Sequence, residues 1–518
     1  MTLPVVSWPA LLPILILTIA GIIVLCWDLW MKAEDKWYLA MVSIVSAALA
    51  LEVSLVYWGR NESAFAGAIA LDSYALFFNF ILCFAVGMTC AMSMHYVDEN
   101  DIPPGEYYAL ILFAAVGMML MAAGTDLIVI FLGLETMSMA VYVLAGILRH
   151  QTRSNEAALK YFLLGAFASG FLLYGIALLY GATGSVQLDK IALYISEHLR
   201  EGAFPPLLFM GVALLIVGFG FKVAAVPFHA WTPDVYEGAP TTITAFMAVG
   251  VKAAAFAAFA RVFLVSLGSV QGQWQWILWV LAVVTMIVGN VTALVQNNIK
   301  RMLAYSSVAH AGYLLVAMVA GGETGGSALM YYLVAYGLMN MGAFAVVVAV
   351  SRRGEPNEEF DDYAGLGFRH PGLALAMTIF MLSLTGIPPL VGFTGKFYVF
   401  SAAVKSGFIW LAVIGVLNSV VSAYYYIRVI VTMYMYDGEK QIEPLSKRPA
   451  LASAIVIAAA ATILIGVFPA TPMWRARTGF ASVEKGPHAT VHSAGASGGS
   501  FASTVSQSER RSGSSTGR

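Results

Sequence analysis

The sequence predicts an all-α polytopic membrane protein with about fourteen transmembrane helices. Hydrophobic residues make up 60% of the 518 residues and charged residues only 11%, less than half of the roughly 25% that is usual in soluble domains. Apolar runs of about 20 residues, long enough to span a bilayer as helices, recur almost to the end of the chain. Loops that contain many Lys and Arg residues also alternate with loops that contain few. The net charge of −1 argues against a nucleic-acid binder.

The apolar runs give the predicted spans in order. The first is a retained span rather than a signal peptide, because its apolar run is too long and no basic segment precedes it. The spans are 9–29, 38–58, 72–95, 107–124, 126–148, 156–180, 206–227, 240–266, 275–297, 301–320, 327–350, 372–404, 409–435 and 450–470.

The loops between these spans predict the orientation of the chain. With the N-terminus outside, twelve basic residues fall in inner loops and four in outer loops. This bias follows the positive-inside rule and predicts an even number of spans with both termini outside. The inner ones are Lys32, Lys36, Arg149, Arg153, Lys300, Arg301, Arg352, Arg353, Arg369, Lys440, Lys447 and Arg448; the outer ones are Arg60, Lys190, Arg200 and Lys405.

Two spans combine a lysine with residues that break helices. Lys222 precedes Pro227, and Lys396 follows Pro388 and Pro389. Such breaks are tolerated at membrane depth where protein or water satisfies the backbone, and they mark the ion path of many transporters. Span 7 is the fourth helix of the five in spans 4–8, and span 12 is the fourth of the five in spans 9–13. Because five is odd, the second group enters the membrane reversed, which predicts two inverted five-helix repeats.

These boundaries divide the chain into five predicted parts. Residues 1–106 form an N-terminal three-helix segment, and residues 107–267 and 268–436 form the first and second repeats. Residues 437–471 carry a C-terminal transmembrane helix. Residues 472–518 are predicted to be a disordered tail, because the Ser-, Gly- and Ala-rich end of the chain has almost no large apolar residue to bury.

Glu135, Lys160, Lys222, Lys252 and Lys396 are charged residues that lie inside apolar spans. A charge at the bilayer centre costs about 2.5–3.5 kcal/mol unless it faces a partner or water. Lys160 stands near the start of its span, so snorkelling to the interface remains an alternative for it. Lys252 is too far from either end of its span to snorkel. Static pairing leaves most of the lysines unexplained, because one carboxylate cannot neutralise four of them.

A hydrated polar axis that passes protons explains these residues better. A lysine loses proton affinity when it is desolvated and regains it when a carboxylate approaches, so a pair that opens and closes can move a proton. His310, inside a span, and His229, beside Pro227, are further candidates because histidine titrates near neutral pH. A structural hydrogen bond for His310 and a loop-anchoring contact for His229 are the alternatives.

Long motifs around these residues resemble the antiporter-like subunits of respiratory complex I, the NADH:quinone oxidoreductase. They are "KVAAVPFHAWTPDVYEGAPTTITAFMAVGVKAAAFA" from Lys222, "KRMLAYSSVAHAGY" at 300–313, "GIPPLVGFTGKF" at 386–397, and the glutamate of "GLE" at 135. The resemblance covers roughly residues 10 to 470. Related subunit M carries Glu where this chain has Lys396, and subunit L adds a long lateral helix, so neither matches as well.

The resemblance implies a proton-translocating module of the membrane arm, which couples quinone reduction to proton pumping. Glu135 and Lys222 would form the modulating ion pair, Lys252 the central relay and Lys396 the terminal group of the second half-channel. Lys160 would belong to the same axis. An Mrp-type cation/proton antiporter subunit, which shares the fold and the lysines, is the main alternative, and a non-transporting membrane scaffold is a third.

The resemblance also implies where the redox chemistry lies and which proteins surround the chain. No cofactor is expected here: NADH, FMN, the iron–sulfur clusters and quinone would belong to other subunits, and the sequence has neither a cysteine cluster nor a convincing dinucleotide-binding motif. The expected partners are the lipid bilayer and other membrane-arm subunits, including the antiporter-like subunit M and the small subunits K and J. The expected location is the bacterial inner membrane, with both termini periplasmic.

Overall fold

The computed structural model describes residues 7–32, 36–198, 205–351, 357–438 and 447–484. The elements of the N-terminal half are α1 (Trp8–Asp28), α2 (Trp37–Val56), β1 (Glu62–Ala64), β2 (Ile69–Leu71), α3 (Ser73–Glu99), α4 (Pro104–Ala123), α5 (Leu127–Ala145), α6 (Thr152–Thr183), α7 (Leu188–His198), α8 (Pro206–Val223), α9 (Trp231–Gly238), α10 (Thr241–Phe246), η2 (Met247–Val251), α11 (Lys252–Ala260) and η3 (Arg261–Ser266). Those of the C-terminal half are η4 (Gly268–Val270), α12 (Gln271–Leu294), α13 (Ile299–Ala320), α14 (Gly322–Val350), η5 (Phe360–Tyr363), α15 (Leu366–Arg369), α16 (Pro371–Thr385), α17 (Val391–Lys405), α18 (Ile409–Met435), α19 (Pro449–Val467) and α20 (Ala470–Glu484).

The predicted fold class, an all-α polytopic membrane protein, is confirmed. Within the described residues, 13 helices are long and apolar enough to cross a membrane. The predicted span 372–404 is two helices of 15 residues each, α16 and α17, separated by residues 386–390. Counted as one interrupted span, this pair completes the fourteen. The sequence did not predict the short antiparallel hairpin of β1 and β2.

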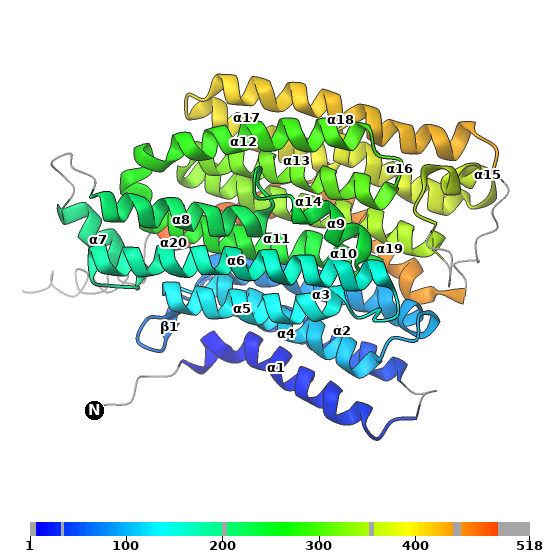
Figure 1. The fold of residues 1–518 in the computed structure, drawn as a ribbon, viewed down its shortest axis with the longest axis horizontal. Coiled ribbons are helices and arrows are strands. Elements are labelled where there is room, and N and C mark those ends of the chain that lie inside the picture. Colours follow the sequence, from blue (N-terminus) through cyan, green and yellow to red (C-terminus); the bar gives the residue numbers. More distant parts are fainter. Residues whose placement is uncertain (1–6, 33–35, 199–204, 352–356, 439–446, 485–518) are drawn as a thin grey trace, which may run out of the picture.

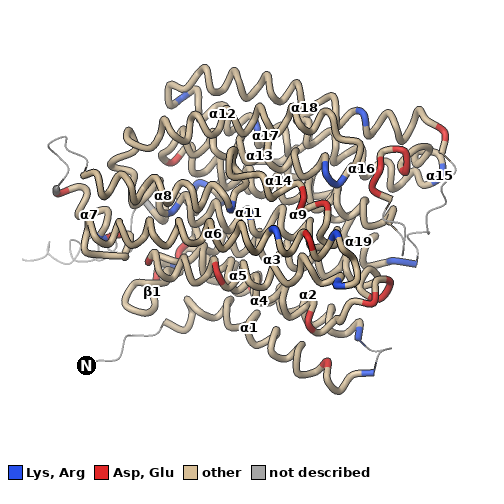
Figure 2. The backbone as a smooth tube through the Cα atoms, in the orientation of Figure 1, with Lys and Arg blue, Asp and Glu red and all other residues tan. Residues whose placement is uncertain are grey.

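The helices run side by side as an elongated bundle, with α1 along one edge and α18 along the opposite edge (Figure 1). α14 is the most enclosed, since every residue of its apolar window is buried, and α13 follows with 94%. By contrast, only 28% of the corresponding window of α19 is buried. A polar side chain within the apolar window of α13 or α14 therefore faces protein rather than lipid. Charged residues gather at the right-hand end of the bundle (Figure 2), and two basic residues, Lys252 on α11 and Lys396 on α17, are buried within it.

Both predicted breaks are non-helical segments in the structure. α8 ends at Val223, and Ala224 adopts a left-handed conformation with a φ of 62° before Pro227. α16 ends at Thr385, and Gly386 stops it with a φ of 95° before the two prolines. A left-handed residue ends an α-helix, and a proline prevents it from resuming. The inverted relation of the two groups of spans stays a prediction.

The span that carries Lys252 is not a regular α-helix. A π-helical segment, η2, directly precedes Lys252, and a second one, η3, follows α11 from Arg261. π-Helical turns widen the helix locally and are frequent at functional sites. Nothing in the apolar sequence of this span indicated them.

The C-terminal end differs from the tail predicted for residues 472–518. α20 continues to Glu484 and packs on α3 and α14, where Phe480 lies against Gly326. A few apolar side chains, including Met473 and Phe480, are enough to bury one face of a polar helix against an existing bundle. The rest of the predicted tail lies outside the described residues.

Candidate functional site

The last turn of α8 holds Lys222 in a polar and aromatic pocket. Its Nζ donates hydrogen bonds to Ser138 Oγ at 2.7 Å and to Tyr142 OH at 3.3 Å, both on α5. The ammonium also lies 5.7 Å from the centroid of the Tyr161 ring. Hydroxyls and π faces both stabilise a cation, so the pocket offsets part of the cost of burying this charge.

Glu135 lies on the same face of α5 as Ser138 and Tyr142, because the three residues are spaced three and four apart. Its Oε1 is buried and has no hydrogen-bond partner. Among the described residues no ion pair of 4 Å or less joins Glu135 to Lys222, although Glu135 shares its face of α5 with the hydroxyls that bind the ammonium. The ion pair that the resemblance implied is therefore open in this structure, and Ser138 holds the ammonium instead.

Lys252, at the start of α11, binds α13. Its Nζ donates both to the backbone oxygen and to the hydroxyl of Ser307. The ring of Tyr336, on α14, lies 5.3 Å from the same nitrogen. No carboxylate contacts this ammonium among the described residues, so neutral oxygens and a π face surround it.

Lys396 is bound by the broken end of α16. Its Nζ donates to the backbone oxygens of Leu384 and Thr385 at 2.9 and 2.8 Å, and to Ser419 Oγ at 2.7 Å. The last carbonyls of a helix have no intrahelical partner and carry its partial negative charge. The break at Gly386 thus supplies the acceptors for the lysine. None of Lys222, Lys252 and Lys396 exposes more than 5% of its surface.

His310 stands between two tyrosines in the interior. Its Nδ1 lies 2.7 Å from Tyr332 OH and its Nε2 lies 3.1 Å from Tyr426 OH. Tyr426 also bonds to the hydroxyl of Ser306. Each hydroxyl can donate or accept, so either tautomer of the imidazole fits this arrangement and a proton could enter at one nitrogen and leave at the other.

These groups converge on α13, which carries Ser306, Ser307 and His310 within two helical turns. Ser307 binds Lys252, while the ring of His310 packs edge-on against Tyr313, 5.5 Å between centroids. The Tyr313 ring in turn faces the ammonium of Lys396 at 5.1 Å. The structure therefore places three of the predicted residues, Lys252, His310 and Lys396, around one helix in the enclosed centre of the bundle.

Lys160 and His229 lie apart from this centre. The side chain of Lys160 is 41% exposed and pairs with Glu156 and Asp234, each at 2.7 Å. His229 is half-buried in the segment between α8 and α9, and its Nδ1 has no hydrogen-bond partner. Neither side chain contacts another of the predicted site residues through the hydrogen bonds of the described chain.

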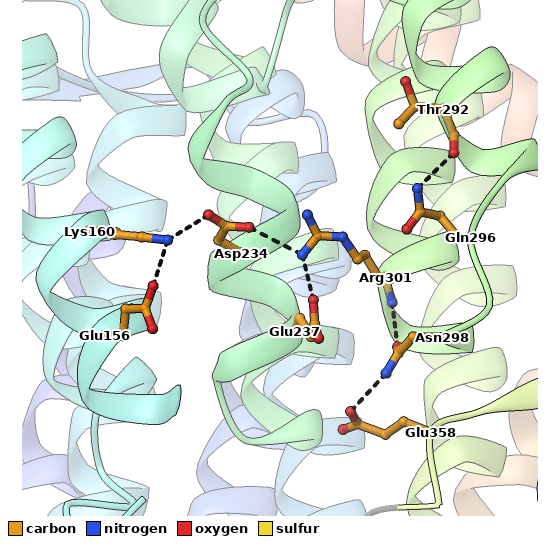
Figure 3. A network of polar contacts seen from close by, with 9 residues as sticks. All are labelled: Glu156, Lys160, Asp234, Glu237, Thr292, Gln296, Asn298, Arg301 and Glu358. Atoms are coloured by element: carbon orange, nitrogen blue, oxygen red, sulfur yellow. Dashed lines mark hydrogen bonds and ion pairs between the residues drawn. The ribbon is translucent and has the colours of Figure 1, made fainter. Parts of the chain in front are cut away.

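Sequence reasoning missed a charged network beside Lys160. Asp234 on α9 lies between Lys160 and Arg301, and Arg301 also pairs with Glu237 at 2.5 Å (Figure 3). These side chains line an open cavity of about 160 Å³. The spacing of three between Asp234 and Glu237, which puts both on one helix face, was the available signal.

The hydroxyl partners of the buried cations were also missed. Ser138, Ser307, Tyr332 and Tyr426 look like ordinary small or aromatic packing residues within apolar spans. For Ser307 the available signal is the Tyr-Ser-Ser run at 305–307, on the span that carries His310. The other three lie on different spans, and their sequence surroundings do not distinguish them.

This arrangement of buried lysines and interrupted helices in an all-helical bundle defines an antiporter-like membrane subunit. A family model described as "NADH:quinone oxidoreductase/Mrp antiporter, TM" matches residues 124–422. NADH-quinone oxidoreductase subunit N of Trichlorobacter lovleyi is 51% identical over 459 residues, which cover 89% of this chain and 94% of that protein. Subunit N 1 of Solibacter usitatus is 46% identical, with 88% and 94% covered. The chain belongs to the subunit N family of NADH-quinone oxidoreductase.

Solved structures agree with this assignment. A chain of respiratory complex I from Thermus thermophilus with bound Aureothin is 35% identical and superimposes with a TM-score of 0.75. The match covers 89% of this chain and 98% of that chain. A chain of the Mrp complex from Dietzia has a TM-score of 0.79 at 20% identity, with 94% of this chain and 99% of that chain covered. At that identity the second likeness shows a shared fold alone.

Proposed function

We propose that the chain is a proton-translocating, non-redox subunit of the membrane arm of a NADH:quinone oxidoreductase, coupling quinone reduction to proton pumping. The observation that carries this proposal is the set of three membrane-embedded lysines, each held by hydroxyls, carbonyls and aromatic faces instead of a carboxylate. Such a setting stabilises an ammonium only partly. Each lysine can therefore give up its proton when a neighbouring charge changes.

The first half of the route would lie between Glu135 and Lys222. Closing their ion pair stabilises the protonated lysine, and opening it, as in this structure, leaves the ammonium on Ser138 and favours release of the proton. The proton would then pass to Lys252. No hydrogen bond joins the two lysines within the described residues, so water would have to complete this step.

The second half would run from Lys252 along α13 to Lys396. Ser307 receives the Lys252 ammonium, and Ser306, Tyr426 and His310 form the adjoining hydrogen-bonded group. Hydroxyls and a neutral imidazole can each accept one proton and donate another, which is what a relay needs. Lys396 would be the terminal group, from which the proton leaves.

The redox steps would take place elsewhere in the complex. We propose that NADH, FMN, the iron–sulfur clusters and quinone are held by other subunits, and that this chain contributes only the passage of protons. Its neighbours would be the antiporter-like subunit M and the small subunits K and J. The chain would lie in the bacterial inner membrane with both termini on the periplasmic side, as its loop charges predict.

The test is Lys252→Ala in membranes that contain the complete complex. We expect assembled complex with severely reduced proton pumping and NADH–quinone turnover. Lys405→Ala is the matched control, because Lys405 is an exposed lysine at the end of α17, outside the route. Wild-type pumping by assembled Lys252→Ala complex would refute the proposed route.

A cation/proton antiporter of the Mrp type is the second candidate, supported by the shared family model and fold. Along this route the hydroxyl and carbonyl oxygens at each lysine bind its ammonium, and an ammonium repels a sodium ion. Purification from native membranes separates the two: redox subunits should accompany the chain in the first case, and other antiporter subunits in the second.

A further inference from the structure

The short helix α9 contacts the surroundings of both Lys222 and Lys252. At its start, the Trp231 ring stacks on Tyr161, with centroids 4.4 Å apart, and Tyr161 lies beside the Lys222 ammonium. Trp231 Nε1 also donates to the backbone oxygen of Phe221 at 3.1 Å, across the break after α8. The aromatic setting of Lys222 is thus built partly on α9.

The other end of α9 reaches the helix that carries Lys252. The hydroxyl of Thr244, on α10, donates to the backbone oxygen of Tyr236 at 2.8 Å. α9 also packs against α13, which carries Ser307, the residue that binds the Lys252 ammonium. A displacement of α9 would therefore change the surroundings of both Lys222 and Lys252.

The backbone alone does not fix the position of α9. The helix has eight residues, and an isolated helix shorter than about 12–15 residues is marginal in water. The non-helical segment 224–230 precedes it, and Pro240 follows Ala239 before α10 begins. Its position must come from contacts with its neighbours, chiefly α6 and α13.

Two consecutive residues at the start of α13 bind α9 through a hydrogen bond and ion pairs. Lys300 Nζ donates to the backbone oxygen of Ala239, at the C-terminal end of α9, at 2.7 Å. Arg301 pairs with Glu237 at 2.5 Å and with Asp234 at 3.2 Å. Lys160 binds the other oxygen of Asp234 from α6, so Asp234 joins three helices (Figure 3).

We propose that Arg301 is a positioning residue for proton transfer: by holding Asp234 and Glu237 it fixes α9, and α9 sets the mutual placement of the Lys222 and Lys252 sites. Arg301 touches neither lysine and acts only through α9. This inference rests on the proposed function, because its effect is read from proton-coupled turnover. In this proposal the charged side chains that line the cavity beside Lys160 fix α9, whether or not Lys160 itself carries protons.

The test compares Arg301→Gln, Glu237→Gln, the double variant and Arg301→Lys in membranes with the complete complex. NADH–quinone turnover is measured per assembled complex across a range of pH. Arg428→Gln is the matched control, since this arginine on α18 donates hydrogen bonds to Gln296 and Asn297 and, within the described residues, makes no hydrogen bond or ion pair with α9. Lys252→Ala is measured in parallel to test the proposed function itself.

Arg301→Gln should lower turnover per assembled complex at least about threefold, a modest effect in keeping with part-exposed ion pairs, and should move the pH profile. The double variant should be no worse than Arg301→Gln, and Arg301→Lys should keep more than half of the activity. A wild-type turnover and pH profile in assembled Arg301→Gln or Glu237→Gln complex would overturn the proposal. A lower yield of complex with normal turnover per complex would also overturn it. If Lys252→Ala also pumps normally, the proposed function fails instead.

Discussion

Removing the hydroxyl of Ser307 should weaken the hold on the Lys252 proton without touching the lysine itself. The Nζ of Lys252 donates to this hydroxyl and to the backbone oxygen of the same residue, and the site is closed to solvent. In Ser307→Ala the backbone oxygen stays and the hydroxyl is lost. The charged lysine then lacks one of its two hydrogen-bond acceptors, and the volume change is small.

The size of the effect follows from this geometry. A hydrogen bond to a charged group contributes about 1.5–3 kcal/mol, and no bulk water can replace it here. Since about 1.4 kcal/mol corresponds to a tenfold change in an equilibrium constant, the protonated form of Lys252 should become about ten- to a hundredfold less favoured. If occupancy of Lys252 limits the cycle, turnover and pumping fall together by about tenfold or more.

The assay is NADH–quinone turnover and proton uptake in membrane vesicles, both expressed per assembled complex. Ser46→Ala is the matched control, because Ser46 is a buried serine on α2 whose hydroxyl bonds only within its own helix. It should leave both rates unchanged. Unaltered rates in Ser307→Ala, alongside an inactive Lys252→Ala, would show that the hydroxyl does not set the proton occupancy of this lysine.

Three further outcomes can be checked in the same membranes. Tyr426→Phe removes the hydroxyl at Nε2 of His310 and should lower turnover severalfold with normal assembly; full activity would exclude this tyrosine from the relay. Arg261→Ala leaves the buried carboxylate of Asp72 without its ion-pair partner, which costs about 3–5 kcal/mol of stability. The amount and the thermal stability of the complex should fall, whereas an unchanged melting temperature would show that the pair is dispensable. Gly392→Ala places a methyl group on a backbone oxygen of α16, so assembled complex should fall sharply; normal yield would mean that α16 and α17 can separate.

The spans could be predicted because the bilayer imposes one requirement on every one of them, a length of apolar helix. The buried lysines were predictable for the same reason, since each interrupts a run that is otherwise apolar. The break at Lys396 followed from its prolines and glycines. These signals all lie within a single span, where a linear reading of the chain can find them.

The partners of the lysines could not be predicted, because they come from distant parts of the chain. Ser307 is 55 residues from Lys252, and Ser138 is 84 residues from Lys222. Serine and tyrosine in apolar helices are common, and only the packing reveals which ones face a charge. Lys160 shows the converse: its position near the start of a span left snorkelling open, and the structure gives it carboxylate partners at a part-exposed edge.

The peptide carbonyls that hold Lys396 and Lys252 have a consequence for genetics. The oxygens of Leu384, Thr385 and Ser307 belong to the main chain, so every replacement of those side chains leaves them in place. Leu384 and Thr385 are buried, so a saturation screen of side chains would report on their packing and not on the two oxygens that bind the lysine. Replacing a peptide bond with an ester, which weakens the carbonyl as an acceptor, would reveal what such a screen passes over.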